Sequence, residues 1–336
     1  RHSSVCRRSG CTMSTNNPIS TVAMAPGVLA ELDTAGDSKP PRRMRKRKLN
    51  AEMARPTAPL SRGERVRLVF AHIWIYLAAA LFMAPLIYAF FSALKPNQEI
   101  FAMPPSLFAS EVRWSNFLDV FAYGPFLTYI GNSFFVSIAG TLVVLIVSTT
   151  AGYAFGRLRW KGRDAVFVLF LATLMVPAEV VVIPMFIVMQ WFGWVDTFQA
   201  LIFPFAFTAF GTFLMRQFFR GIPFELEEAA RVDGAGPIRS FLQIILPLSK
   251  SAVAVLSVFT FLGFWNSYLW PLIVTVDYAA HGTLPIGLAS FSGLTGTRWD
   301  LQMAAAIISM IPTTVLVIAL QKHLVKGISM AGLGGR

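Results

Sequence analysis

The sequence predicts an all-α membrane protein with six transmembrane helices and a polar helix-turn-helix loop between the fourth and the fifth. The chain has 336 residues, of which 55% are hydrophobic and only 14% are charged, which is too apolar for an ordinary soluble globule. The apolar residues gather in runs of about 20, the length of a helix that crosses a bilayer. We place the spans at 69–93, 128–153, 165–190, 198–216, 251–276 and 303–322.

Residues 1–67 are predicted to form a disordered basic tail, because they are rich in Ser, Pro, Gly and charge and have no apolar period. The tail holds 14 basic and 5 acidic residues, so +9 of the net charge of +12 lies there. Its run 42–48 could bind nucleic acid. A basic run ahead of membrane spans instead favours contact with anionic membrane lipid, and no nucleic acid partner is expected. Cys6 and Cys11 form no C-x-x-C metal pattern.

The loops between the spans predict the orientation of the chain, because cytoplasmic loops carry an excess of Lys and Arg. The loop 153–164 has four basic residues and one acidic residue, a net charge of +3. The loops 95–127 and 277–300 each have more acidic than basic residues. The first of these three loops is therefore expected inside and the other two outside. Both termini and the loop 216–250 then lie in the cytoplasm.

The loop 216–250 is predicted to form a short helix, a glycine turn and a second helix. Pro223 can open the first helix, and three carboxylates follow where the positive end of the helix dipole favours them. Gly234 can end that helix in the left-handed conformation, and Pro237 can open the second. Four apolar residues of the second helix are expected on one face: Ile238, Phe241, Leu242 and Ile245.

The same loop resembles a specific family pattern. ABC importer permeases carry a cytoplasmic loop of the form E-A-A, three residues, G, nine residues, I, one residue, L-P. Every fixed position is matched by Glu228-Ala229-Ala230, Gly234, Ile244 and Leu246-Pro247. The alternative, an ordinary amphipathic connector, does not explain this spacing. The chain thus resembles the maltose-type (MalG-like) family of carbohydrate ABC importer permeases, which are binding-protein-dependent inner-membrane proteins.

The resemblance implies a type I ABC importer permease fold, with a six-span domain at 68–326 and a cytoplasmic tail at 327–336. It implies four kinds of partner: a second permease subunit, two ABC ATPase subunits, an extracytoplasmic sugar-binding protein and lipid of a bacterial or archaeal cytoplasmic membrane. ATP and Mg²⁺ would be bound by the ATPases, and this chain would bind no cofactor. The residues that would couple transport to the ATPases are Glu228, Ala229, Ala230, Asp233, Gly234 and Ala235.

Two places within the spans are candidates for the solute pathway. Glu179 lies near the middle of the third span, where a charge costs about 2.5–3.5 kcal/mol on insertion scales. It therefore needs a partner group, which is either a structural hydrogen bond to the paired permease or a sugar hydroxyl. Trp265, Asn266 and Tyr268 form a polar aromatic cluster in the fifth span. Such side chains suit sugar rings and hydroxyls, although helix packing explains them equally well.

The sequence carries no catalytic constellation. It has no G-x-x-x-x-G-K-[ST] stretch to cradle ATP phosphates and no H-E-x-x-H zinc motif. Its four histidines are scattered, so no metal site is expected. The resemblance therefore implies a transport subunit for a sugar, and not an enzyme. The alternatives are an ABC permease for glycerol-phosphate esters, polyols or peptides, and a secondary transporter, which would leave the loop at Glu228 unexplained.

Overall fold

The computed structural model describes residues 62–104, 106–293 and 296–333. Most of the predicted basic tail therefore lies outside the described residues. The first helix, α3 (Arg62–Ala93), begins inside the predicted tail 1–67, and a division between two compact units falls within it, after Trp74. Every other described helix and strand lies in the second unit, Ile75–Arg336.

Three helices of the described chain are long and apolar enough to cross a membrane: α3, α5 (Phe126–Gly156) and α17 (Trp299–Leu333). Three bent helix pairs raise the number to as many as six if each pair forms one span. The prediction of six spans agrees with that upper number. The last helix continues to Leu333, so its backbone includes most of the segment predicted as a tail, 327–336.

The first bent pair corrects the prediction of one continuous third span at 165–190. Here α6 (Arg163–Ala172) and the 3-10 turn η2 (Thr173–Met175) meet α7 (Ala178–Trp191) at an angle of 104°. Val176 is extended at the break, since a residue before proline disfavours the helical conformation.

The second bent pair falls within the predicted fourth span, 198–216. Its first part is α8 (Phe198–Ile202) with η3 (Phe203–Phe205), and its second is α9 (Ala209–Arg220). The two parts meet at 46°. The Thr208 hydroxyl caps α9 by accepting a hydrogen bond from the Gly211 amide.

The third bent pair joins the segment Pro237–Leu248 to α13 (Lys250–Trp265) at 78°. The predicted fifth span, 251–276, is interrupted, because α13 ends at Trp265 and α14 (Leu269–Val274) follows after a short break. The sequence did not reveal this break.

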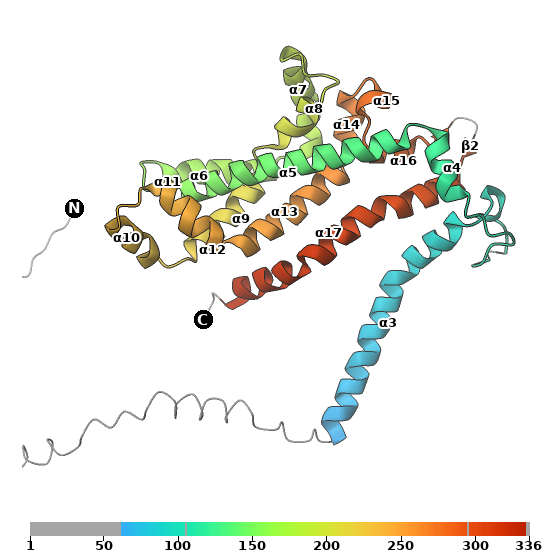
Figure 1. Ribbon diagram of the computed structural model, residues 1–336, viewed down its shortest axis with the longest axis horizontal. Coiled ribbons are helices and arrows are strands. Elements are labelled where there is room, and N and C mark those ends of the chain that lie inside the picture. The colour runs from blue at the N-terminus through green and yellow to red at the C-terminus, as the bar shows by residue number, and fades with distance from the viewer. Residues whose placement is uncertain (1–61, 105, 294–295, 334–336) are drawn as a thin grey trace, which may run out of the picture. The chain divides into compact units, whose positions relative to one another are not determined.

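The helix α5 runs through the middle of the second unit, where it packs against α9 and α13, and α13 packs in turn against α17 (Figure 1). Close approach to α9 depends on Gly152, because a Cβ placed there would lie 2.7 Å from the Cβ of Met215. The sequence pattern Gly152-x-x-x-Gly156 is therefore a helix contact. A core cluster that includes Tyr153, Phe219 and Ile245 lies at this end of α5.

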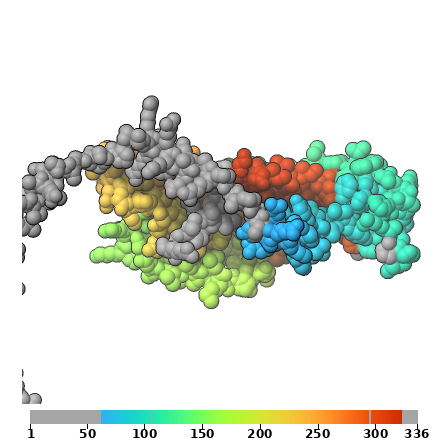
Figure 2. All heavy atoms as spheres, turned by 90° about the horizontal axis from the view of Figure 1, so that it is seen from below, coloured from blue at the N-terminus to red at the C-terminus, as the bar shows by residue number. Residues whose placement is uncertain are grey.

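The two ends of α5 carry different structures. At one end lie the short helices between α9 and α13. At the other lie the short elements of the segments predicted to be outside. Figure 1 shows α10 and α4 at opposite ends of the unit, and the yellow and cyan atoms of these parts of the chain lie apart in the same way in Figure 2. The second group comprises η1 (Asn97–Glu99), α4 (Asn116–Tyr123), α15 (Tyr278–His281), α16 (Leu284–Ala289), β1 (Ser292–Gly293) and β2 (Gly296–Thr297). The two strands pair antiparallel, with Ser292 opposite Thr297.

Candidate functional site

The loop between α9 and α13 forms a helix that ends in a glycine turn. The helix α10 (Glu225–Val232) has its three carboxylates in the first turn, where the helix dipole stabilises them. Gly234 follows with φ of 79°. The Ala235 amide donates to the Ala230 carbonyl at 2.8 Å, a bond that closes the left-handed cap. The predicted end of this helix at Gly234 is therefore confirmed.

The residues predicted to contact the ATPases are divided between two faces of this turn. Glu228, Ala229, Asp233 and Gly234 are exposed, whereas Ala230 is buried and Ala235 is half-buried. Sequence reasoning missed Val232, whose side chain is 89% exposed beside them. It also missed Glu227, which is buried. The sequence held no signal for the burial of Glu227, because the burial of Ala230, three residues away on the same face, is itself seen only in the structure.

The second helix departs from the predicted pattern. It consists of α11 (Pro237–Ser240), a π-helical turn η4 (Phe241–Ile245) and α12 (Leu246–Leu248). The four apolar residues expected on one face lie on two. Phe241 and Ile245 are buried, whereas Ile238 and Leu242 are exposed. On a regular α-helix all four would share one face, and the wider π turn at Phe241–Ile245 breaks that period.

The end of α5 holds this loop in place. The Tyr153 hydroxyl donates to the Pro237 carbonyl at 3.2 Å, and the Tyr153 ring lies 4.9 Å from that of Phe241. On the other side, the Arg216 guanidinium donates to Asp164 at 3.1 Å and stacks 3.9 Å above the Phe167 ring. Tyr153 therefore fixes the loop to the end of α5, and the contacts of Arg216 join the preceding helix α9 to α6.

The four predicted pathway residues do not form one cluster. Trp265 is 2% exposed, donates to the Ser309 carbonyl at 3.2 Å and stacks on Phe261. It is a core residue, so its assignment to an open pathway is corrected. Asn266 and Tyr268 are exposed at the break between α13 and α14.

Glu179 is exposed in the first turn of α7, directly after the break at Val176 and Pro177. It therefore lies at the N-terminus of a half-helix and not in the middle of a straight span. Trp265, Asn266 and Tyr268 belong to a different part of the chain, around the end of α13.

An open groove of about 440 Å³ lies between α5, α9 and α13. Its walls are mainly apolar and aromatic, with a few hydroxyls. The residues that line it are Val144, Thr173, Leu174, Pro204, Phe205, Phe207, Thr208, Ala209, Phe210, Leu256, Phe259, Thr260, Gly263, Phe264 and Ser267. Two of these residues adjoin the predicted cluster in the sequence: Phe264 precedes Trp265, and Ser267 lies between Asn266 and Tyr268.

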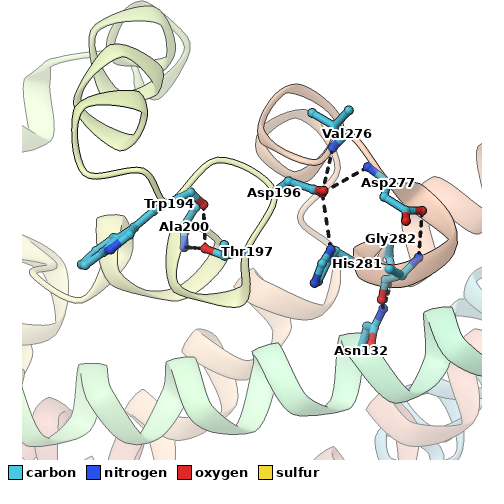
Figure 3. A network of polar contacts seen from close by, with 10 residues as sticks. Asn132, Trp194, Asp196, Thr197, Ala200, Val276, Asp277, His281 and Gly282 are labelled. Atoms are coloured by element: carbon cyan, nitrogen blue, oxygen red, sulfur yellow. Dashed lines mark hydrogen bonds and ion pairs between the residues drawn. The ribbon is translucent and has the colours of Figure 1, made fainter.

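A polar network lies at the other end of α5 (Figure 3). Asp196 accepts hydrogen bonds from the amides of Val276 and Asp277 and lies 3.4 Å from Nδ1 of His281. Burial raises the pKa of Asp196, but the two amides and His281 outweigh that effect and hold its pKa below the ordinary value. The Asn132 amide donates to the Ala280 and Gly282 carbonyls at 2.9 Å each, which ties α5 to this network.

No group of three or more His, Cys, Asp or Glu side chains that could hold a metal ion occurs in the described part of the chain. Arg216, Asp164 and Asp196 are engaged in ion pairs or hydrogen bonds, whereas Glu179, Glu228 and Asp233 are exposed. The geometry is that of a helical membrane protein with a structured polar turn at one end.

Comparison with known proteins identifies the family. Residues 148–330 match the family described as "Binding-protein-dependent transport system inner membrane component". The chain belongs to this family. It is therefore a multi-pass inner-membrane permease subunit of an ABC importer, as the loop at Glu228 predicted, and not an enzyme.

Relatives extend the similarity beyond the matched region. The sn-glycerol-3-phosphate transport system permease protein UgpE of Pectobacterium atrosepticum is 37% identical over 268 residues, which cover 77% of this permease and 95% of that protein. UgpE of Escherichia coli O1:K1 is 35% identical over the same length. Among solved structures, a bacterial ABC transporter involved in the import of the acidic polysaccharide alginate has a TM-score of 0.69 at 24% identity and covers 80% of this permease and 100% of that chain. That likeness shows the fold.

Proposed function

We propose that this permease forms half of the pathway of an ATP-driven importer for a neutral sugar. Its partners would be a second permease subunit, two ABC ATPase subunits that bind ATP and Mg²⁺, and an extracytoplasmic sugar-binding protein. Both termini and α10 would lie in the cytoplasm. Closure of the ATPases would move α10 and switch the spans between inward-open and outward-open arrangements.

The coupling role rests on the surface of α10 and its turn. Glu228, Ala229, Asp233 and Gly234 are exposed together, and Val232 adds an apolar side chain to the same region. An exposed apolar residue within a polar rim is a common arrangement for a protein interface. Because Ala229 has a small side chain, a partner could approach the helix closely there.

The chemistry of the spans favours a neutral solute. The sequence contains no Lys or Arg between Ala165 and Met215 or between Ser251 and Thr297, the two stretches that supply most of the groove lining. The one carboxylate or basic side chain between Ala165 and Trp191 is Glu179, which is exposed and would repel a phosphate. Aromatic walls and hydroxyls suit the faces and hydroxyl groups of a sugar.

A phosphate ester is the second candidate, because the relatives with 35–37% identity are named as sn-glycerol-3-phosphate permeases. The complete importer, reconstituted in proteoliposomes with its binding protein, separates the two. We expect uptake of a labelled neutral sugar, found by screening a sugar panel, that excess sn-glycerol 3-phosphate does not inhibit. Uptake of sn-glycerol 3-phosphate without uptake of any neutral sugar would refute the proposal.

The same assay tests Glu179 as a pathway residue. Glu179→Ala is expected to lower uptake while the complex assembles and basal ATPase activity persists, and Glu179→Gln to be milder because one acceptor oxygen remains. Loss of assembly in Glu179→Ala would instead make this residue a structural contact to the second permease.

A further inference from the structure

A buried ion pair joins α5 to α10. Arg157 caps the C-terminus of α5, and its amide donates to the Tyr153 carbonyl at 2.8 Å. Nε of Arg157 lies 3.3 Å from Oε1 of Glu227, and the side chains are 0% and 6% exposed. Nη2 of Arg157 donates to the Ile222 carbonyl at 2.7 Å, and its guanidinium lies 4.1 Å above the Phe224 ring. The side chain that follows the end of α5 thus contacts Ile222 and Phe224, which precede α10, and Glu227 within α10.

We propose that Arg157 and Glu227 are positioning residues for energy coupling, which transmit a displacement of α10 to α5. The inference rests on the proposed function, in which α10 contacts an ATPase. Glu227 lies on the buried face of α10 and Glu228 on the exposed face. Adjacent carboxylates therefore have separate tasks, since Glu228 faces the partner and Glu227 holds the helix to its own span.

The environment of the pair makes the connection strong. Water is excluded from both groups, so their attraction is screened far less than that of an exposed pair. The neighbouring pair of Arg216 with Asp164 is different, because the Asp164 side chain is 67% exposed and such pairs contribute little. Removing one member of the Arg157 pair leaves an uncompensated buried charge, whereas removing both members often costs little.

The contacts also allow α10 to rotate. Among the described residues, Nε and Nη1 of Arg157 and Oε1 of Glu227 make no hydrogen bond. Charge attraction therefore holds Arg157 to Glu227, and stacking holds it to Phe224, while its Nη2 is hydrogen-bonded to the Ile222 carbonyl, which precedes α10. Both interactions depend less on angle than a hydrogen bond does. The pair can therefore act as a pivot that keeps α10 attached to α5 while its tilt changes.

The other end of α5 explains why this span is a suitable recipient of the motion. Its Asn132 amide is bonded to the carbonyls of Ala280 and Gly282, and the Ser133 hydroxyl accepts from the Leu284 amide at 2.7 Å. A helix of 31 residues is thus bonded to α10 at one end and to the segment before α16 at the other. If α5 moves as a rigid helix, a shift at its Arg157 end is carried to the contacts of Asn132 and Ser133 at its other end.

The test compares single and double substitutions in the complete importer. The variants are Arg157→Met, Glu227→Gln and the double variant, with Arg159→Met as the matched control because Arg159 is exposed two residues away. Three quantities are measured: thermal stability, co-purification of the ATPase, and solute imported per ATP hydrolysed. We expect each single variant to lose stability and the double variant to recover it.

The ratio of solute to ATP distinguishes positioning from a purely structural role. If the pair transmits motion, the double variant assembles normally but imports at least about tenfold less solute per ATP, a typical size for coupling between sites. Recovery of this ratio together with stability would overturn the proposal. Arg157→Lys provides a second arm, since it keeps the charge but lacks the planar group that stacks on Phe224. It should lower the ratio partly, and an unchanged ratio would also overturn the proposal.

The variant Glu228→Arg tests separately whether α10 contacts the ATPase at all. If α10 does not contact the ATPase, Glu228→Arg leaves co-purification and uptake unchanged, whatever the Arg157 variants do. If α10 is the contact but the pair is not the pivot, Glu228→Arg abolishes co-purification while the Arg157 and Glu227 double variant transports normally.

Discussion

The turn after α10 offers a test in which conformation alone is changed. Gly234 has φ of 79°, and a Cβ added there would meet no atom within 4 Å. Gly236 is equally open but has φ of −75°. Replacing either residue with Ala therefore causes no clash, and the two variants differ in the backbone conformation that the new side chain must adopt.

The expected cost follows from that difference. An L-residue other than Gly pays roughly 1–2 kcal/mol to adopt the left-handed conformation, and this corresponds to a factor of about 5–30 in an equilibrium. Gly234→Ala should therefore weaken ATPase association by about that factor, because the turn presents Asp233 and Val232 to the partner. Gly234→Asn should be milder, since Asn tolerates this conformation better than Ala. Gly236→Ala should have no effect.

The assay is the dissociation constant between the permease pair in nanodiscs and the purified ATPase, with thermal stability of the permease measured in parallel. If Gly234→Ala and Gly236→Ala bind the ATPase equally well, the turn at Gly234 does not shape the contact. If Gly236→Ala is as weak as Gly234→Ala, the loss arises from flexibility or sequence and not from positive φ. Either result refutes the reasoning.

Three further predictions follow from packing, charge and topology. Gly152→Ala should destabilise the permease by about 1–3 kcal/mol through overpacking against α9, whereas Gly131→Ala, which meets no neighbour within 4 Å, should not; equal denaturation midpoints would contradict this. Since the folded pKa of Asp196 lies below its ordinary value of 3.8, its stabilisation is present above that pH and is lost as the pH falls through the folded pKa. The melting temperature of the wild type should therefore fall more steeply on acidification than that of Asp196→Asn, and parallel curves would count against the network. In a background without native cysteines, Ser110→Cys should react with an impermeant thiol reagent from outside and Arg159→Cys should not; the reverse pattern would invert the proposed orientation.

Local rules explain which parts of the loop could be predicted from sequence. The helix ending at Gly234 and the helix beginning at Pro237 depend on single-residue conformational preferences, and the structure has both. The distribution of Phe241 and Ile238 between buried and exposed faces was not predictable in the same way. A helical wheel assumes 3.6 residues per turn, and the π turn at Phe241–Ile245 changes that period where the loop packs against Tyr153.

Tertiary packing explains the remaining differences. Proline lies inside α3, α7 and α17 without ending them, whereas Pro177 coincides with a bend of 104°. The sequence alone does not distinguish these cases, since a proline breaks a helix only where neighbouring packing accepts the bend. The burial of Trp265 likewise depends on Phe134 of α5 and Ser309 of α17, which are distant from it in the sequence, as well as on Phe261 in its own helix.

The bend at Pro177 also changes the electrostatic environment of Glu179. In a straight span, a carboxylate at mid-membrane would need a partner group to offset its insertion cost. At the N-terminus of α7 it lies beside backbone amides that have no acceptor within the helix, and the positive end of the helix dipole favours a negative charge there. The charge is thus stabilised by its own helix, and its exposed oxygens remain available for a second interaction. Structural burial against the partner permease is therefore not required to explain Glu179, and hydrogen bonds from solute hydroxyls to its oxygens stay a prediction that the uptake of Glu179→Ala tests.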